Sequence, residues 1–207
     1  MPSVRSKKRP LRSKVCVQAG DELLDVADDT CARLELGSYP ARTFDVVLWN
    51  DALHQVDDKL HALEQTRRVL RSGGRVGIAA TAQEREHEFD RALLRVLTRL
   101  GMVKAARRTR AAARGVSTDE VLGWLWESGF VDIALQIRTF GDSFTDPDQI
   151  IGRYFSAVGE ALFGRLDSAP CERVKRELRA ELERQRTARG VRLERHVIFA
   201  VGSVGDA

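Results

Sequence analysis

Two polar residues that could take part in binding or catalysis follow a short apolar run. Phe44–Trp49 is rich in Val and nearly continuous in apolar residues, which predicts a strand buried on both faces of a parallel sheet. Asn50 ends this run, and His54 follows four residues later. Ligands of α/β proteins bind at the carboxyl ends of parallel strands, so we expect His54 to act as a general base or to orient a substrate. The competing interpretation is that His54 caps or packs beneath the loop.

A helix and a second apolar run must hold these residues in place. From Val56 the apolar residues recur at three-, four- and seven-residue spacing, which predicts an amphipathic helix that ends at Ser72–Gly74. Arg75–Ala80 then predicts a second buried strand. Strand, helix and strand together predict one right-handed crossover unit whose two strands lie parallel and side by side.

This succession of residues resembles a known family. The run FDVV, an Asn, ALHQV, a helix ending in RVLRSGG and a further apolar strand resemble the fourth strand, the following helix and the fifth strand of class I S-adenosylmethionine-dependent methyltransferases, in particular the small-molecule type. The resemblance implies a Rossmann-like α/β fold with a mostly parallel sheet and a C-terminal antiparallel hairpin. It also implies methyl transfer from S-adenosylmethionine to oxygen or nitrogen of a small organic acceptor.

The resemblance assigns the ribose of the cofactor to the neighbourhood of Gln18. Val15–Val17 is then the family's second strand, and Asp21–Ala27 begins the helix after it. Similar proteins usually carry at the position of Gln18 an acid that binds both ribose hydroxyls. An amide lacks the charge-assisted acceptance of a carboxylate, which predicts weaker cofactor binding. Alternatively, Gln18 is only a polar turn residue.

The other cofactor contacts are implied at the ends of the next two strands. Ala32–Leu36 is expected as the third strand, with Gly37 and Ser38 in the loop beside the adenine. Asn50 and the backbone around Trp49 would face the methionine end of the cofactor.

The glycine-rich loop with which the family opens has no counterpart in the first residues. Residues 1–14 include Pro2, Pro10 and six basic residues, and such a segment cannot form a central buried strand. We therefore expect the place beside Phe44 to be filled by a partner chain or a second copy, or the sheet to be rearranged, or the sequence to be a shortened form. Alternatively, Val15–Gly20 is itself that strand, with a degenerate loop.

The remaining chain predicts helices that alternate with the last two strands. Helical lid insertions are expected at about 84–116 and 146–190. Between them, a helix capped by Ser117 precedes a strand at Val131–Thr139, and Leu193–Val201 is expected as the final strand.

Composition narrows the classes of protein that this chain could represent. With 207 residues, 43% hydrophobic and 31% charged, it predicts a basic, disordered tail at 1–14 and one globular domain at 15–207. The tail carries six of the positive charges, so the remainder has a net charge of −2, which argues against a protein-wide nucleic-acid surface. No apolar run approaches the roughly 20 residues of a membrane span. Three separated cysteines without a CxxC pair predict reduced thiols and a cytoplasmic location, and the four histidines share no metal-binding constellation.

Two other functions remain open from the sequence. The missing glycine loop and Gln18 favour a methyltransferase-like protein that has lost its cofactor and acts as a partner or regulatory subunit. The basic tail and the five basic residues from Lys104 to Arg114 are the features that support an RNA-modifying enzyme, but we favour a solvated arm and a solvated helix face as their explanation.

Overall fold

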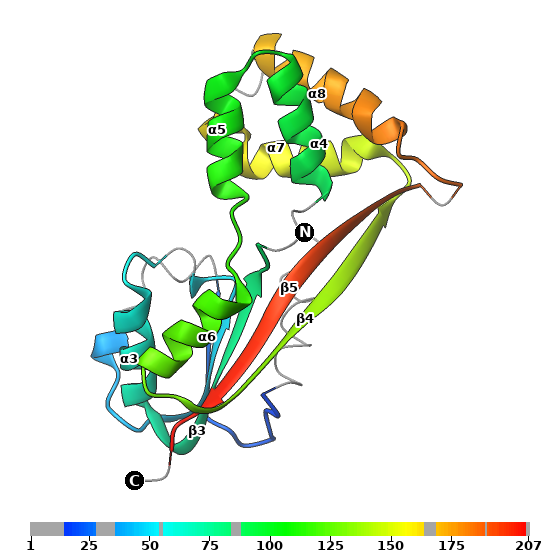
Figure 1. Cartoon of the computed structure of the whole chain (residues 1–207). Coiled ribbons are helices and arrows are strands. Elements are labelled where there is room, and N and C mark those ends of the chain that lie inside the picture. The colour runs from blue at the N-terminus through cyan, green and yellow to red at the C-terminus, as the bar shows by residue number, and fades with distance from the viewer. Residues whose placement is uncertain are drawn as a thin grey trace. The chain divides into compact units, whose positions relative to one another are not determined.

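The protein is described here by a computed structural model that covers residues 15–27, 36–53, 56–83, 88–163, 169–188 and 190–205. The chain divides into two compact units, a sheet unit and a helical unit (Figure 1). The sheet unit comprises Met1–Glu84, Gly115–Arg138 and Val197–Ala207. The helical unit comprises Arg85–Arg114 and Thr139–His196.

The fold is a mixed sheet flanked by helices, as the resemblance implied. Its strands lie in the order β1-β2-β3-β5-β4. β1, β2 and β3 are parallel, and β5 runs antiparallel to β3. Their bounds are Leu23–Ala27 for β1, Phe44–Asn50 for β2, Leu70–Thr81 for β3, Val131–Phe144 for β4 and Val191–Ser203 for β5.

The predicted crossover between Phe44 and Ala80 is confirmed, with one shift of boundary. β2 and β3 are adjacent and joined by α3 (Lys59–Val69), whose N-cap Asp58 accepts a hydrogen bond from the backbone N–H of His61. The helix ends before Leu70, so its predicted end at Ser72–Gly74 is wrong. Leu70 pairs with Phe44, and the glycines lie within β3, where the register between β2 and β3 shifts. They accommodate an irregular strand and do not cap the helix.

The strand beside β2 comes from this chain, which corrects the expectation of an unfilled place. Leu23 pairs with Val46 and Ala27 with Asn50. The segment Asp21–Ala27 was predicted as a helix start, but its apolar residues satisfy their backbone groups by pairing with the open edge of β2. Local helix propensity is weaker than this long-range pairing.

Two further strand predictions fall near β1. Val15 and Cys16 form a turn, so the strand predicted at Val15–Val17 is not formed. Most of the strand predicted at Ala32–Leu36 lies outside the described residues, and Leu36–Ser38 forms a short 3-10 helix, η1.

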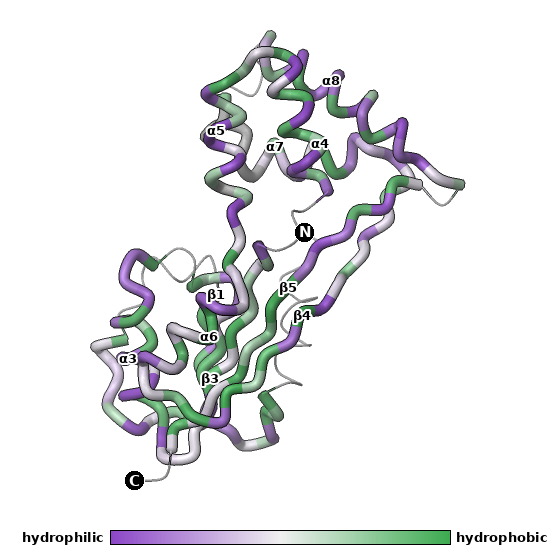
Figure 2. The backbone as a smooth tube through the Cα atoms, viewed as in Figure 1, coloured by the Kyte–Doolittle hydropathy of each residue, from purple (hydrophilic) through white to green (hydrophobic). Residues whose placement is uncertain are grey.

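The core of the sheet unit lies between the sheet and the helices α3 and α6 (Thr118–Glu127). Ser117 and Glu120 form a capping box at the start of α6, so this predicted cap is confirmed. The part of β5 in this unit is mostly apolar and its other end is mostly polar (Figure 2). The buried side chains include Val47, Trp49, Leu63, Val76, Ile78, Leu125 and Ile198.

The helical unit contains most of the two segments predicted as insertions, at about 84–116 and 146–190, together with the adjoining parts of β4 and β5. It contains α4 (Glu88–Arg99), α5 (Val103–Ala112), α7 (Pro147–Phe163) and α8 (Ala169–Glu183). Their role as a lid stays a prediction. None of the described helices is long and apolar enough to cross a bilayer.

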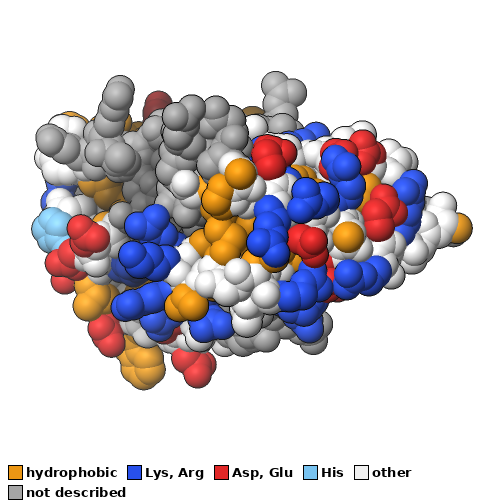
Figure 3. Space-filling view, turned by 90° about the horizontal axis from the view of Figure 1, so that it is seen from above, with side chains coloured by type: hydrophobic (Ala, Val, Ile, Leu, Met, Phe, Trp, Pro, Cys, Tyr) orange, Lys and Arg blue, Asp and Glu red, His pale blue; other side chains and the backbone are white. Residues whose placement is uncertain are grey.

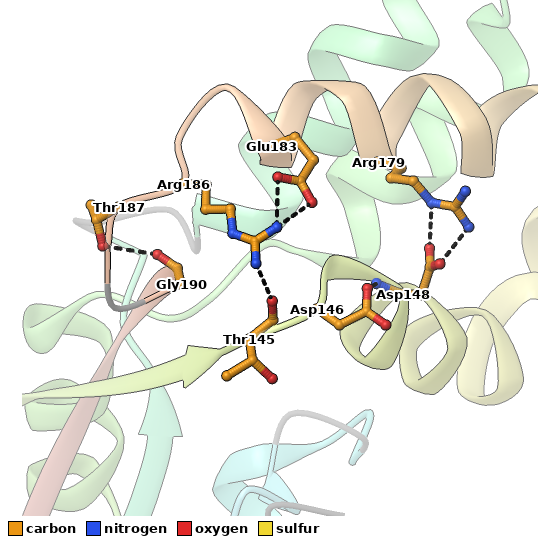
Figure 4. A network of polar contacts seen from close by, with 8 residues as sticks. All are labelled: Thr145, Asp146, Asp148, Arg179, Glu183, Arg186, Thr187 and Gly190. Atoms are coloured by element: carbon orange, nitrogen blue, oxygen red, sulfur yellow. Dashed lines mark hydrogen bonds and ion pairs between the residues drawn. The ribbon is translucent and has the colours of Figure 1, made fainter.

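Ion pairs join the helices of this unit. Arg95 on α4 lies 2.9 Å from Glu181 on α8, and α8 carries acidic and basic side chains next to one another, as in the right-hand part of Figure 3. Arg179 pairs with Asp148 near the start of α7 (Figure 4). In the same view, Arg186 contacts Glu183 and donates to the carbonyl oxygen of Thr145 at 3.0 Å. These contacts tie the end of α8 to the start of α7.

Candidate functional site

The carboxyl ends of β1 and β2 lie side by side and form the edge where α/β proteins bind ligands. Ala27 and Asn50 are directly opposite in the parallel register. The backbone turns sharply after Asn50, because Asp51 has a φ of 60° and donates its N–H to the carbonyl of Ala79 at 2.8 Å. The next residue, Ala52, is buried. This edge therefore combines a tight backbone turn at Asp51 with a buried apolar residue, Ala52.

Asn50 is the polar side chain that this edge encloses. It is 3% exposed, and neither its amide nitrogen nor its amide oxygen has a hydrogen-bond partner in the described part of the chain. A buried polar group without a partner costs about 1–3 kcal/mol, so its retention indicates a role outside the fold. One amide offers a donor and an acceptor at the same point.

Asp25 is a second polar residue on the same face of the sheet, and the sequence analysis missed it. The indole of Trp49 donates to Thr66 on α3, so Asn50, the next residue, points to the opposite face. Asp25 pairs with Leu48, which shares the face of Asn50. One of its carboxylate oxygens is shielded from solvent. An acid inside the apolar run LLDVA was the available signal, but the segment was taken for a helix.

The residues predicted at this edge have different surroundings. The Trp49 side chain is buried against α3, so only its backbone faces the edge. His54 lies outside the described residues, and its catalytic role stays a prediction. Within the described ranges, no group of three His, Cys, Asp or Glu side chains is placed to hold a metal ion.

Gln18 lies at the other end of the parallel strands. Its backbone N–H donates to the Asp21 carboxylate at 2.9 Å, and Asp21 also pairs with Arg75 at 3.0 Å. Arg75 is opposite Val46, near the start of β2. A seven-residue strand is about 20 Å long, so Gln18 and Asn50 are separated by most of that length.

Gly37 and Ser38 are held at this same amino end. Arg68, in the last turn of α3, donates to the carbonyl of Leu36 at 2.8 Å and to that of Tyr39 at 3.0 Å. The ring of Tyr39 meets Phe44 edge to face, with centroids 5.3 Å apart. The structure therefore does not bring Gly37 and Ser38 together with Asn50.

Hydrogen bonding and burial shift pKa values away from this edge, among them those of Asp45 and Tyr154. The hydrogen bond from Arg71 lowers the pKa of Asp45 at the amino end of β2. Burial raises the pKa of Tyr154 on α7, and the neighbouring Asp90 acts in the same direction. Tyr154 therefore stays a neutral phenol near pH 7.

The methyltransferase domain family matches residues 12–78, a segment that contains β1, β2, α3 and part of β3. This segment includes both Asp25 and Asn50. Over this segment the chain is therefore similar to methyltransferase domains.

The comparisons also give the extent of this relationship. The chain is 35% identical over 95 residues to the 27-O-demethylrifamycin SV methyltransferase of Amycolatopsis mediterranei. This match covers 44% of the chain and 30% of the relative, so the chain spans less than a third of that protein. The structure is also similar to that of a Bacillus halodurans protein, a proposed methyltransferase. The superposition covers 97% of this chain and 99% of the other, with 13% sequence identity and a TM-score of 0.57. That likeness shows the fold alone.

The residues at this edge match the methionine end of S-adenosylmethionine, the cofactor that the resemblance implies, in one respect. That end carries an ammonium group and a carboxylate within one small unit. The Asn50 amide can accept from the first and donate to the second, and neither of its buried polar atoms has a partner in the described chain.

Proposed function

We propose that the chain is a methyltransferase that uses S-adenosylmethionine and acts on a small organic acceptor. The observation that carries the proposal is the buried Asn50 amide, which lacks a partner in the described chain and lies at the carboxyl end of β2. The Amycolatopsis relative supports oxygen as the methylated atom, because its name specifies an O-demethylated acceptor.

Asn50 and Asp25 would hold the methionine end of the cofactor. The Asn50 Nδ2–H groups would donate to the α-carboxylate, and Oδ1 would accept from the α-ammonium. Asp25, on the same sheet face, adds negative charge near the cationic part of the ligand. When bound, the cofactor supplies an activated methyl group and a neutral thioether leaving group.

The chain's contribution to the reaction is mainly positional. Fixing the acceptor in line with the methyl group can lower a barrier by up to about 7–11 kcal/mol. The buried Ala52 and Leu53 beyond Asn50 keep this edge dry. His54 would accept the proton that an acceptor hydroxyl loses as the new C–O bond forms.

Isothermal titration with S-adenosylmethionine and S-adenosylhomocysteine tests the proposal. We expect saturable binding to the wild-type chain and a loss of about tenfold or more for Asn50→Ala, since removing a hydrogen bond to a charged group costs about 1.5–3 kcal/mol. Gln149→Ala is the matched control, because it removes an exposed amide from α7. Its affinity should equal that of the wild type.

Two outcomes would count against the proposal. The absence of any saturable heat at millimolar cofactor would remove the enzyme hypothesis and favour the partner-subunit alternative. Equal binding by Asn50→Ala and the wild type would show that the Asn50 amide is not the cofactor contact.

A further inference from the structure

A second site is formed at the amino ends of the parallel strands. A pocket of about 540 Å³ lies between the turn before β2, the last turn of α3, the start of β3 and the turn that joins α6 to β4. These elements belong to the sheet unit (Figure 1). Three arginines, Arg42, Arg67 and Arg68, line the pocket with one acid, Glu64.

Arg67 is held flat against the turn at Gly129. A Cβ built on Gly129 would lie 3.3 Å from Cζ and 3.4 Å from both Nε and Nη1 of Arg67. Nearly equal distances to these three atoms place that point over the face of the guanidinium. The positive φ of Gly129, 79°, belongs to the turn that ends α6. The packed face leaves the N–H groups in the guanidinium plane available.

The N–H groups of Arg67 have no partner in the described chain. Arg67 forms neither a hydrogen bond nor an ion pair with any described residue. Glu64 precedes it by three residues on α3, and its carboxylate lies 4.0 Å from Nδ1 of His61. Among the described residues, no ion pair joins Glu64 to Arg67.

Arg42 and Arg68 add charge to the same wall. Arg42 donates its backbone N–H to the carbonyl of Arg68 at 3.0 Å, which fixes the turn, and its side chain has no partner among the described residues. The Arg68 guanidinium is already committed to Gln65 at 2.8 Å and to two loop carbonyls. Two arginines are therefore available to a ligand, and the third contributes a fixed positive charge.

The chemistry of this wall matches a phosphate group. Guanidinium groups bind phosphate oxygens with two parallel N–H donors, and three arginines against one carboxylate leave a net positive pocket. Val131 and Val204 also line it, so an organic substituent would meet apolar surface.

We propose that this pocket binds a phosphate ester, with the phosphate on Arg42 and Arg67 and the organic group against Val131 and Val204. The site is separate from the proposed cofactor edge. Asn50 ends β2, the pocket adjoins its start, and a seven-residue strand sets about 20 Å between them.

Titration with phenyl phosphate, without S-adenosylmethionine, tests the proposal apart from the methyltransferase function. We expect saturable binding to the wild type, and a loss of about tenfold or more for Arg67→Ala and for Arg42→Ala. Arg67→Lys should also bind more weakly, because an ammonium cannot donate in the bidentate geometry. Inorganic phosphate tests binding of the phosphate group alone, and phenol tests binding of the organic group alone. Each should bind more weakly than phenyl phosphate.

Arg107→Ala is the matched control, since it removes an exposed arginine on α5 outside the pocket. Its affinity for phenyl phosphate should equal that of the wild type. Loss of affinity in Arg107→Ala as large as in Arg67→Ala would show nonspecific charge attraction and overturn the proposal. Absence of saturable binding to a wild-type chain with an intact thermal transition would overturn it as well.

Discussion

Trp49 donates its indole N–H to the hydroxyl of Thr66 across 3.0 Å, and both side chains are buried. This bond links β2 to α3 and sets the face of the sheet to which Trp49 points. By strand alternation, it also sets the opposite face for Asn50. The orientation of the candidate site residue thus depends on a contact on the other side of the sheet.

Thr66→Val should destabilise the sheet unit. The substitution keeps the shape of the side chain but removes the acceptor of the Trp49 indole, and an unpaired buried donor costs about 1–3 kcal/mol. Urea unfolding followed by tryptophan fluorescence measures the change. Thr98→Val, on the exposed face of α4, is the control and should change the free energy of unfolding far less. Equal effects of the two variants would contradict the prediction.

Asn50→Leu should leave the fold as stable or make it more stable. The amide is buried without a partner in the described chain, so replacing it with an apolar group of similar size relieves about 1–3 kcal/mol of desolvation cost. Thermal unfolding without ligand measures this change, and the exposed Gln149→Leu serves as the reference. A marked loss of stability would indicate that Asn50 is retained for structure.

Val26→Pro should disrupt β1. Proline removes a backbone donor and is excluded from the interior of a strand, with a cost of about 3 kcal/mol or more. Val26→Ala separates this backbone effect from the loss of a buried side chain and should be the milder change. Chemical denaturation of both variants gives the comparison. Equal stability of the two variants would argue against a paired strand at Leu23–Ala27.

Asp45→Asn should lower stability at neutral pH and lose its effect in acid. Arg71 lies 2.6 Å from the carboxylate, and its hydrogen bond holds the pKa of Asp45 below the usual range of an aspartate. A group whose pKa is depressed on folding adds stability above its unfolded pKa, and this contribution is lost as pH falls through the folded pKa. Unfolding curves from pH 7 to below pH 3 should show the wild type and the variant converging. A constant difference across that range would contradict this linkage.

Local patterns predicted the elements whose signals lie within the element itself. Ser117 and Glu120 cap α6, and Gly129 ends it in a left-handed conformation, so both boundaries follow from residue type. The strand–helix–strand unit around α3 was also predicted correctly, because the spacing of its apolar residues changes from that of a strand to that of a helix. Of the residues predicted at the candidate edge, Asn50 and the backbone around Trp49 lie in the described part of the chain.

The errors concern segments whose structure depends on distant partners. Leu23–Ala27 has five residues, too few for a period to separate strand from helix, and the edge of β2 decides the outcome. The glycines after Leu70 resemble a helix stop, but pairing with Phe44 draws them into β3. Asp25 was missed for the same reason, since its face is defined only once β1 is a strand.

The connectivity of β4 and β5 limits how this protein could be re-engineered. β4 begins in the sheet unit and ends in the helical unit, whereas β5 begins in the helical unit and ends in the sheet unit. The chain therefore passes from one unit to the other within each of these strands, and also near Arg85 and Arg114. The helical unit is consequently assembled from two discontinuous stretches and cannot be excised or transplanted as one cassette. A graft that exchanged the helices of this unit would have to join the chain within the strands and preserve their alternation, because a one-residue error would invert every side chain beyond the junction.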